Sequence, residues 1–564
     1  MFKIVRGGNN MAFSAKTRQE NIEKLKSTPL DLLIIGGGIT GAGITVEAGA
    51  KGLANGLIEM GDFASGTSSR STKLIHGGLR YLKQFDVENV AEVSREREII
   101  YNNAAHIVHP TPMILPIYNE QGASFSSFSA EVALKLYDEL SDVQEEYKNY
   151  FLDKESTLER EPALKKEDLL QAGVYLDYTS DDARITTELM KKANEFGSVI
   201  ANYVKAVDFI FDDQQKVAGV KAQDVITGEQ FDIKADIIMN ATGPWSDETR
   251  EKSEADSEQR MRPTKGVHLV VPEERLHVNG PIYTDSSFSD NRMLFIIPRN
   301  GKTYFGTTDT DYTGDINHPT VSQEDIEYLL KAINYRFPEA KLTVTDIEAS
   351  WAGLRPLIAE SGGKNPSAVS RGSSLTESEN GLITIAGGKL TDYRKMAEGS
   401  LKLISKRLKE KTGKEYPEVD TKVVKLSGGN VPLGSKFDAY VEEQAKKGME
   451  TGLSKEEAEK LVRWFGSNAS EIFERANSFK KPANLDLGDA LFLIYTLENE
   501  MVLTPTDFFD RRTESILFDY HHVLEIKEAV IEFMADYYQW DAATKGKMVV
   551  ELEETIAEAD LSNL

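Results

Sequence analysis

The residues most suited to chemistry begin with a glycine-rich run near the N-terminus. Gly36, Gly38 and Gly41 have the spacing in which the first glycine allows a tight turn, the second lets a phosphate approach the backbone and the third allows close helix packing. Glu59 follows eighteen residues after Gly41, where a carboxylate can bind ribose hydroxyls. These residue types at this spacing predict a dinucleotide site.

A strand, a turn and a helix are needed to position these residues. The apolar run 31–35 predicts a buried strand, and the helical pattern that follows directs its N-terminal amides and positive dipole end at the phosphates. Glu59 closes a second apolar run, 56–59, which predicts the next strand. A glycine-rich turn in an unrelated fold would leave Glu59 without a role. The cofactor-binding residues predicted in this stretch are Gly36, Gly38, Ile39, Thr40, Gly41 and Glu59.

The bulk composition limits the class of protein. At 564 residues the chain is too long for one compact core, and 40% hydrophobic with 28% charged residues fits a globular enzyme. The absence of cysteine excludes disulfides, Cys-ligated zinc, iron–sulfur clusters and cysteinyl flavin links. Nothing suggests secretion, so a cytoplasmic protein is expected. No metal site is expected either, because four histidines have no acidic partners at metal-ligand spacing: His106, His109, His521 and His522.

The formal net charge is −25, from 66 basic and 91 acidic side chains, which argues against nucleic acid and anionic lipid as partners. An anionic substrate would be repelled by this field, so a local cluster of Arg and Lys must attract it at short range. The apolar segment 31–50 contains Asp31, Glu47 and six glycines, so no membrane span is predicted. Residues 1–10 are interpreted as a leader before a natural start at Met11, and a homodimer is left open.

Three separated stretches are predicted to form one nucleotide-binding domain. After the first, the alternating run 199–204 leads through two hairpins to a buried strand that ends in Ala241-Thr242-Gly243-Pro244-Trp245. A third strand meets Gly387-Gly388-Lys389-Leu390-Thr391, and the pattern over 393–406 predicts a helix. A strand ending in Ala-Thr-Gly beside a cofactor is typical of flavoproteins of the two-dinucleotide type.

The predicted organisation is α/β with three domains. An FAD-binding domain is expected over 20–85, 175–250 and 345–412, and a substrate-binding domain with a mixed sheet over 86–174 and 251–344. Strand-like runs 267–271 and 293–297 belong to the second domain, and the polar segment 360–380 is predicted to be a surface loop. Residues 413–564 are expected to form a helical domain, with helical spacing at 455–464, 487–497 and 523–539.

Longer motifs carry a resemblance to a known family. The run 66–81, Gly-Thr-Ser-Ser-Arg-Ser-Thr-Lys-Leu-Ile-His-Gly-Gly-Leu-Arg-Tyr, resembles the FAD-dependent glycerol-3-phosphate dehydrogenase/oxidase family. Other segments that resemble it are 240–245, 306–309, 353–357, 387–391, 465–468 and 506–512. The resemblance covers nearly the whole chain after residue 30. It implies a glutathione-reductase/D-amino-acid-oxidase-like fold, non-covalent FAD and glycerol 3-phosphate as substrate.

The resemblance also implies site residues. Those expected to bind FAD are Thr67, Ser68, Ser69, Lys73, Leu74, His76, Gly77, Gly78, Val204, Ala241, Thr242, Gly243, Trp245, Gly388, Lys389, Leu390 and Thr391. Those expected to bind substrate are Arg80, Tyr81, Arg355, Arg371, Lys389 and His268. Arginine forks suit a phosphomonoester dianion, although a single Arg or Lys is more often a solvated surface charge.

Oxidation of the secondary alcohol removes a proton from oxygen and a hydride from C2 to flavin N5. His76 is the candidate base, the alternative being that it only hydrogen-bonds the flavin or a carbonyl, and Arg355 could polarise the C2 oxygen. His268 lies in an apolar strand, where a satisfied core residue is the alternative. Arg299-Asn300-Gly301 departs from the family pattern and is expected to be a hairpin tip that does not contact substrate.

Four functions remain open on the sequence. An oxidase would use O2 and release H2O2, whereas a respiratory dehydrogenase would pass the electrons to a membrane quinone. A sensing or scaffolding flavoprotein would leave the basic cluster idle, and an NAD-dependent dehydrogenase fits only the first motif. The oxidase is favoured because the chain is acidic, lacks a strongly basic amphipathic helix and is similar to the alpha-glycerophosphate oxidases of lactic-acid bacteria.

Overall fold

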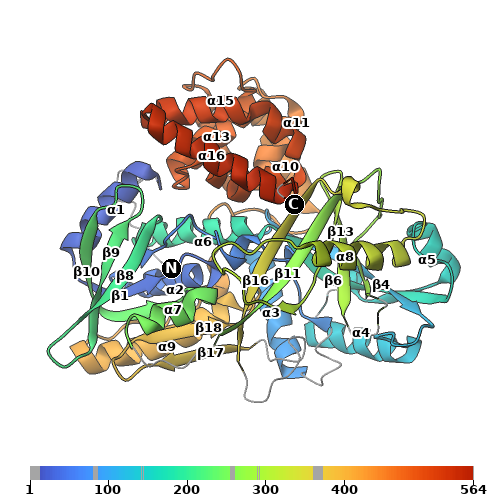
Figure 1. The fold of residues 1–564 in the computed structure, drawn as a ribbon, viewed down its shortest axis with the longest axis horizontal. Helices are drawn as coiled ribbons and strands as arrows, with labels where there is room; N and C mark the ends of the chain where they lie inside the picture. The colour runs from blue at the N-terminus through green and yellow to red at the C-terminus, as the bar shows by residue number, and fades with distance from the viewer. Residues whose placement is uncertain are drawn as a thin grey trace.

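The computed structural model describes residues 13–79, 87–141, 143, 145–254, 261–286, 288, 290, 292–359, 372–562 and 564. Within these residues the chain forms two sheets that lie side by side, each with its own helices. A group of C-terminal helices lies across both, at the top of Figure 1.

The first sheet is mostly parallel. Among the described residues it contains eight strands: β1 (Leu30–Ile35), β2 (Asn55–Ile58), β7 (Val199–Ala201), β8 (Val204–Phe211), β9 (Val217–Asp224), β10 (Gln230–Asn240), β17 (Ser373–Glu377) and β18 (Ile383–Gly387). The order is β17-β18-β10-β1-β2-β7, and β9 and β8 extend from β10 as antiparallel strands. Every residue of β1 is buried, and Leu32–Ile35 lie between two parallel neighbours, which explains why these four residues are all apolar.

Helices cover this sheet. They are α1 (Ala15–Ser27), α2 (Ile39–Lys51), α6 (Asp182–Glu195), α7 (Ser246–Glu251) and α9 (Tyr393–Thr412). Helix α2 follows β1 directly, packs against α6 and α9, and ends at Gly52, whose φ of 81° gives the left-handed C-cap that glycine favours. The predicted strands at 31–35 and 56–59 and the helix from 393 are confirmed within a residue or two at their starts.

The second sheet is mixed, as predicted. Its strands among the described residues are β3 (Leu74–Ile75), β4 (Val108–Tyr118), β5 (Tyr150–Asp153), β6 (Leu169–Ser180), β11 (Met261–Pro272), β12 (Ile282–Asp285), β13 (Met293–Arg299), β14 (Lys302–Gly306), β15 (Thr310–Asp311) and β16 (Ala349–Ile358). Only β12 and β4 pair in parallel among these described strands. The accompanying helices are α3 (Val87–Asn103), α4 (Ser127–Ser141), α5 (Lys154–Arg160) and α8 (Gln323–Arg336).

Three details differ from the sequence-based expectations. Strand β16 pairs along its whole length with β11 in the second sheet, and β6 lies there too, although 345–412 and 175–250 were assigned to the first domain. The run 199–204 is two strands, interrupted at Tyr203 by a φ of 53°. Within the expected surface loop 360–380, residues 373–377 form β17, whose polar, half-exposed residues suit a sheet edge. Residues 360–371 of that loop lie outside the described residues.

The C-terminal region is helical, as predicted. Its helices are α10 (Lys436–Met449), α11 (Lys455–Phe465), α12 (Ala469–Ala476), α13 (Leu487–Asn499), α14 (Ser515–Phe518), α15 (Tyr520–Tyr538) and α16 (Ala542–Ala559). Their apolar faces share one hydrophobic core with the first sheet and its helices. None of the helices in the described part of the chain combines the length and the apolar character required to cross a membrane.

Candidate active site

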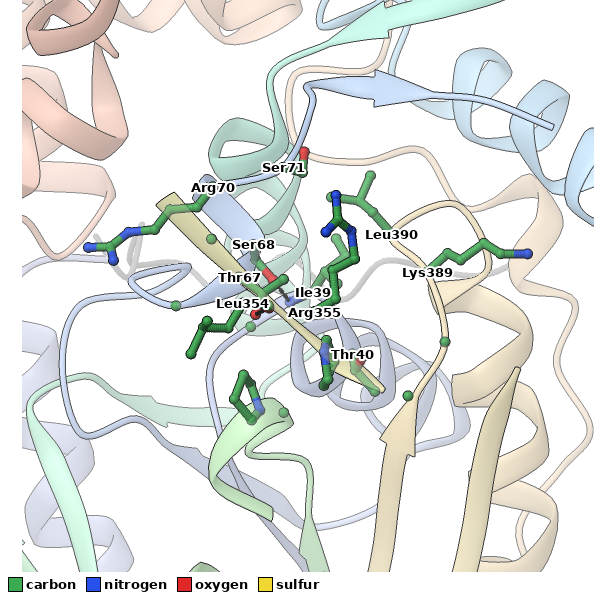
Figure 2. Close-up of a pocket in the computed structure, with 18 of the residues that line it drawn as sticks. Ile39, Thr40, Thr67, Ser68, Arg70, Ser71, Leu354, Arg355, Lys389 and Leu390 are labelled. Carbon is green, nitrogen blue, oxygen red and sulfur yellow. Dashed lines mark hydrogen bonds between the residues drawn. The ribbon is translucent and has the colours of Figure 1, made fainter. Parts of the chain in front are cut away.

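A cavity of about 440 Å³ lies where the carboxyl ends of the first sheet's strands meet the second sheet. Parallel α/β sheets bind ligands at this edge because the strand-to-helix turns converge there. Residues after β1, β2, β10 and β18 line one end of the cavity, and residues from β6, β11, β13 and β16 line the other. Figure 2 shows part of its lining, including Thr40, Ser68 and Arg355.

The glycine-rich turn makes one wall of the cavity. Gly36 has a φ of 115°, and a Cβ there would lie 2.5 Å from the carbonyl oxygen of Ala241, so no other residue fits without displacement of the backbone. Gly38, Ile39 and Thr40 also line the cavity. Gly41 does not line it; a Cβ at Gly41 would lie 1.9 Å from the carbonyl oxygen of Gly36, which confirms the packing role predicted for the third glycine.

Glu59 lies beside this turn at the end of β2. Its Oε2 accepts a hydrogen bond from the Gly37 amide at 2.6 Å, and its Oε1 accepts one from the Gly61 amide at 2.8 Å. Burial raises the pKa of this carboxyl, while the two amides oppose that shift. The carboxylate is therefore held in one orientation at the cavity wall.

Residues 66–73, termed the flavin loop below, form the next part of the lining. Ser68 Oγ accepts a hydrogen bond from the Ile39 amide at 2.9 Å, and the Thr67 hydroxyl donates to the Leu354 carbonyl at 2.6 Å. The loop thus connects the start of α2 with β16. Two of its predicted cofactor residues do not line the cavity: Ser69, and Lys73, whose buried side chain is directed to the opposite face of the loop.

After the flavin loop, Leu74, His76 and Gly78 line the cavity. Gly77 does not: its amide donates to the Tyr137 hydroxyl at 2.8 Å and to Asp177 Oδ1 at 3.2 Å, and a Cβ there would lie 2.5 Å from that hydroxyl oxygen. The remaining predicted cofactor residues in the cavity lining are Val204, Ala241, Thr242, Gly243, Trp245, Gly388, Lys389, Leu390 and Thr391.

Two histidines reach the cavity. The ring of His76 lies 5.8 Å from that of Phe295, centre to centre. The ring of His268 stacks on Trp351 at 4.6 Å and shares a hydrogen bond of 3.1 Å between Nε2 and Thr72 Oγ1. Burial, with further contributions from Arg355 and Lys73, lowers the pKa of His268 well below its usual range, so this imidazole is neutral.

Arg355 brings positive charge into the cavity from β16. Its guanidinium donates to Thr307 Oγ1 at 2.9 Å, to the Thr308 carbonyl at 3.2 Å and to Asp309 Oδ1 at 3.3 Å. These contacts fix the plane of the guanidinium. Lys389 also lines the cavity, but in Figure 2 its side chain extends away from that of Arg355.

Arg292 is a cation in the lining that the sequence did not single out. Its guanidinium donates to the backbone carbonyl of Asp309 at 2.9 Å, and the side chain of the same residue accepts a hydrogen bond from Arg355. Arg292 immediately precedes β13, but nothing in the local sequence distinguishes it from the other arginines of the chain. The predicted residues Arg80, Tyr81 and Arg371 lie outside the described residues.

Comparison with known proteins defines the class. Residues 31–394 match the family model described as FAD dependent oxidoreductase, and residues 419–545 match the one described as the C-terminal domain of alpha-glycerophosphate oxidase. The chain therefore belongs to the FAD-dependent oxidoreductase family. This confirms the fold class and the cofactor predicted from the sequence.

Individual relatives show which members of the family the chain is similar to. The chain is 47% identical to the alpha-glycerophosphate oxidase of Streptococcus pyogenes serotype M6, over 98% of this chain and 99% of that protein. It is 44% identical to the alpha-glycerophosphate oxidase of Lactococcus lactis, over 98% and 100%. The crystal structure of glycerol-3-phosphate dehydrogenase from Bacillus halodurans complexed with FAD superposes with a TM-score of 0.82 at 40% identity, covering 97% of this chain and 98% of that one. The family named from the motifs is thus confirmed.

Proposed function

We propose that this protein oxidises sn-glycerol 3-phosphate to dihydroxyacetone phosphate, with FAD as the cofactor and O2 as the electron acceptor, and releases H2O2. The observation that carries the proposal is one cavity that joins a dinucleotide cradle, Gly36 to Glu59, to a histidine and a fixed arginine, His76 and Arg355. The names of relatives that are 44–47% identical over nearly the whole chain support the same reaction.

The cavity has the chemistry that FAD requires. A glycine turn without space for a side chain, backbone amides at the start of α2 and an oriented carboxylate at Glu59 suit a pyrophosphate and a ribose. The strand ends at Ala241–Gly243 and Gly388–Thr391 would hold the cofactor further along the cavity. When bound, FAD supplies the hydride acceptor and passes the electrons on to O2.

The substrate phosphate requires cations within a strongly acidic molecule. Arg355 and Arg292 flank Asp309 in the second-sheet half of the cavity, and Lys389 lies at its other wall. We assign Arg355 as the main phosphate or C2-oxygen contact because its guanidinium is already oriented by three acceptors. Arg80, Tyr81 and Arg371 remain proposed substrate ligands from the motif.

His76 is the proposed base that takes the proton of the C2 hydroxyl. It follows the flavin loop and lines the cavity, whereas burial lowers the pKa of the other cavity histidine, His268, well below its usual range and makes it a weaker base. We assign His268 to hydrogen bonding through its neutral ring. Arg355 would stabilise the alkoxide character that develops on the C2 oxygen.

The proposal is tested with the purified holoenzyme. Its oxidised-flavin absorbance should be lost on anaerobic addition of glycerol 3-phosphate, and oxygen should restore it with one H2O2 formed for each flavin. If the flavin stays oxidised after glycerol 3-phosphate is added, the proposed substrate is wrong. Slow reoxidation by oxygen without peroxide, together with fast reoxidation by a quinone, would show that the protein is a dehydrogenase instead.

A further inference from the structure

Lys73 ends the flavin loop and is buried behind it. Its ammonium donates to the Ser69 carbonyl at 3.0 Å, to Asp182 Oδ1 at 2.9 Å and to Glu514 Oε1 at 2.6 Å. An ammonium has three N–H donors, so all of them are used. Lys73 is 1% exposed and has a φ of 58°, a backbone conformation that lysine rarely adopts. The loop conformation therefore depends on the acids that hold this cation.

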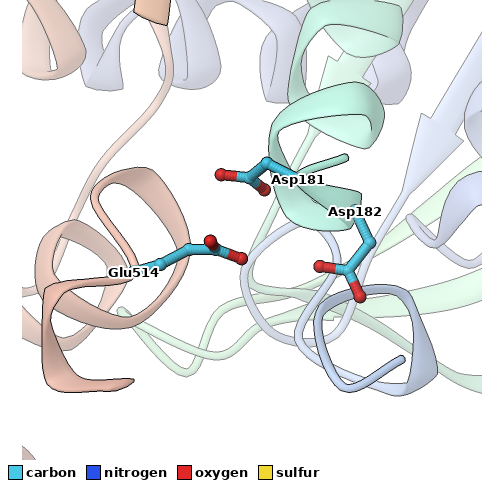
Figure 3. Close-up of side chains that lie close together, drawn as sticks. All are labelled: Asp181, Asp182 and Glu514. Carbon is cyan, nitrogen blue, oxygen red and sulfur yellow. The ribbon is translucent and has the colours of Figure 1, made fainter. Parts of the chain in front are cut away.

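These acids come from two different parts of the fold. Asp182 begins α6, and its Oδ2 accepts a hydrogen bond from the Ser71 amide at 2.9 Å, so it holds the loop at two points. Glu514 belongs to the C-terminal region, and its second oxygen accepts a hydrogen bond from Arg299 at the tip of the β13–β14 hairpin. Figure 3 shows Asp181 and Asp182 at the start of α6 with the Glu514 carboxylate directed between them.

The three carboxylates of Asp181, Asp182 and Glu514 lie close enough to share a metal ion, because one oxygen of each lies within 4.8 Å of the others. Positive charge is already present there, however. Lys73 is bonded to Asp182 and Glu514, and the Arg299 guanidinium is bonded to Glu514 and lies 4.0 Å from Asp181 Oδ2. The cluster is therefore organised around side-chain cations.

A second contact joins the same C-terminal segment to Asp62, which lies between Glu59 and the flavin loop. Asp62 accepts hydrogen bonds from Arg511 at 2.8 Å and from Arg512 at 2.7 and 2.9 Å, and all three side chains are buried. The two ends of the segment 62–73 are therefore attached to residues 511–514, Asp62 through Arg511 and Arg512 and Lys73 through Glu514. No described residue after Thr391 lines the cavity itself.

We propose that Glu514 is a positioning residue for FAD binding, which acts through Lys73 to hold the flavin loop in the conformation that presents Thr67 and Ser68 to the cofactor. The C-terminal region would then support FAD binding although none of its described residues lines the cavity. Because Ser68 also bonds the first amide of α2, displacement of the loop changes the pyrophosphate end as well. The inference rests on the proposed use of this cavity by FAD and is independent of the alcohol oxidised.

The test compares two buried carboxylates in the holoenzyme. Glu514→Gln keeps the shape and removes the charge that pairs with Lys73. Glu188→Gln is the matched control, since Glu188 is equally buried and pairs with Arg184 and Lys191 on its own helix, α6. The dissociation constant of FAD is measured by the fluorescence of flavin released on dilution, and the visible flavin spectrum and the thermal unfolding temperature are recorded for each variant.

We expect Glu514→Gln to weaken FAD binding roughly tenfold or more and to alter the flavin spectrum, because Lys73 and Arg299 lose the carboxylate that they share and Lys73 keeps only Asp182 as a charged partner. Glu188→Gln should lower the unfolding temperature and leave the FAD dissociation constant within about twofold of wild type. Equal loss of thermal stability in both variants, with wild-type FAD affinity and spectrum in Glu514→Gln, would overturn the proposal.

Should Glu514→Gln fail to fold, Glu514→Asp takes its place, because it keeps the charge and shortens the reach by one methylene. It is judged by the same two outcomes. A wild-type flavin that glycerol 3-phosphate does not reduce would contradict the proposed function alone, since FAD affinity is measured without substrate.

Discussion

His76 and His268 both line the cavity, but their surroundings give them different chemistry. His268 is buried in an aromatic stack with Trp351 and Tyr304, near the positive charges of Arg355 and Lys73, and its pKa is strongly lowered. Lowering the pKa of a base weakens its ability to accept a proton. His76, beside Phe295 at the cavity wall, is therefore the better candidate for the alcohol proton.

Replacement of His76 by Asn should slow flavin reduction by roughly 10²- to 10⁴-fold, the usual contribution of a positioned base. The dissociation constant of glycerol 3-phosphate should change much less. Both are obtained from anaerobic stopped-flow reduction at a series of substrate concentrations. His268→Gln should lose less rate than His76→Asn, and the reverse order would remove His76 from the role of base.

Replacement of Arg355 by Lys keeps the charge but loses the planar fork. We expect the KM for glycerol 3-phosphate to rise roughly 10- to 100-fold, equivalent to about 1.4 to 2.7 kcal/mol, because a lysine cannot make two parallel bonds to an oxyanion. Steady-state peroxide formation measures this. Arg275→Lys is the control, since Arg275 is exposed and pairs with Asp346 away from the cavity; equal effects of both changes would contradict the assignment.

The residue types of the site could be predicted from the sequence better than the directions of their side chains. The glycines and Glu59 were predicted because short-range spacing determines a strand–turn–helix unit, whereas His76 was implied by the resemblance of the run 66–81 to the family. Lys73 was expected at the cofactor, but its buried side chain does not line the cavity and bonds to Asp182 and Glu514 instead. Nothing local in the sequence indicates which face of a loop a side chain occupies, and Arg292 was missed for the same reason.

At the scale of elements, the β1–α2 turn depends on the absence of a Cβ at Gly36. Gly36→Ala should weaken FAD binding at least roughly tenfold, because a φ of 115° is strained for alanine and the methyl group would meet the Ala241 carbonyl. The dissociation constant of FAD measures the effect. Gly399→Ala in α9 is the matched control: a Cβ there has no heavy atom within 4 Å, so it should be neutral or slightly stabilising.

Helix α6 begins at a carboxyl whose titration should make stability depend on pH. Asp181 Oδ1 accepts a hydrogen bond from the Arg184 amide at 2.7 Å, while Oδ2 is buried without a hydrogen-bond partner among the described residues. Burial, reinforced by the charge of Glu514, raises the pKa of Asp181 to about 8, and Arg299 and Lys73 oppose the shift. The native state therefore holds a proton at pH 4 to 8 that the unfolded chain has released.

It follows that the free energy of unfolding should fall as pH rises from about 4 to about 8, by an amount on the order of a few kcal/mol from this group. Asp181→Asn keeps a side-chain oxygen for the cap and cannot titrate. The variant should lose less stability than wild type between pH 5 and pH 8 in chemical denaturation. An identical pH dependence in the two proteins would show that Asp181 does not hold the proton.

Periodicity predicted most elements because each helix and strand buries a regular face. The C-terminal helices at 455–464, 487–497 and 523–539 were found in this way, and so were the central strands. Periodicity could not predict which distant strands pair with one another. The register of β16 with β11 joins residues about ninety positions apart, and the edge strand β17 has too little apolar character to be recognised.

At the scale of the whole molecule, the net charge and the charge of the substrate-binding part of the cavity have opposite signs. The net charge of −25 opposes the approach of a phosphate dianion, while Arg355, Arg292 and Lys389 attract it only near the cavity.

Salt shortens the Debye length from about 30 Å at 0.01 M to about 8 Å at 0.15 M, so the long-range repulsion is screened more than the short-range attraction. We therefore expect kcat/KM for glycerol 3-phosphate to rise over this range of ionic strength. Reoxidation of the reduced flavin by O2 serves as the internal control, because an uncharged reactant does not respond to the field. A kcat/KM that falls with salt would instead show that the cavity cations dominate the field far from the protein surface.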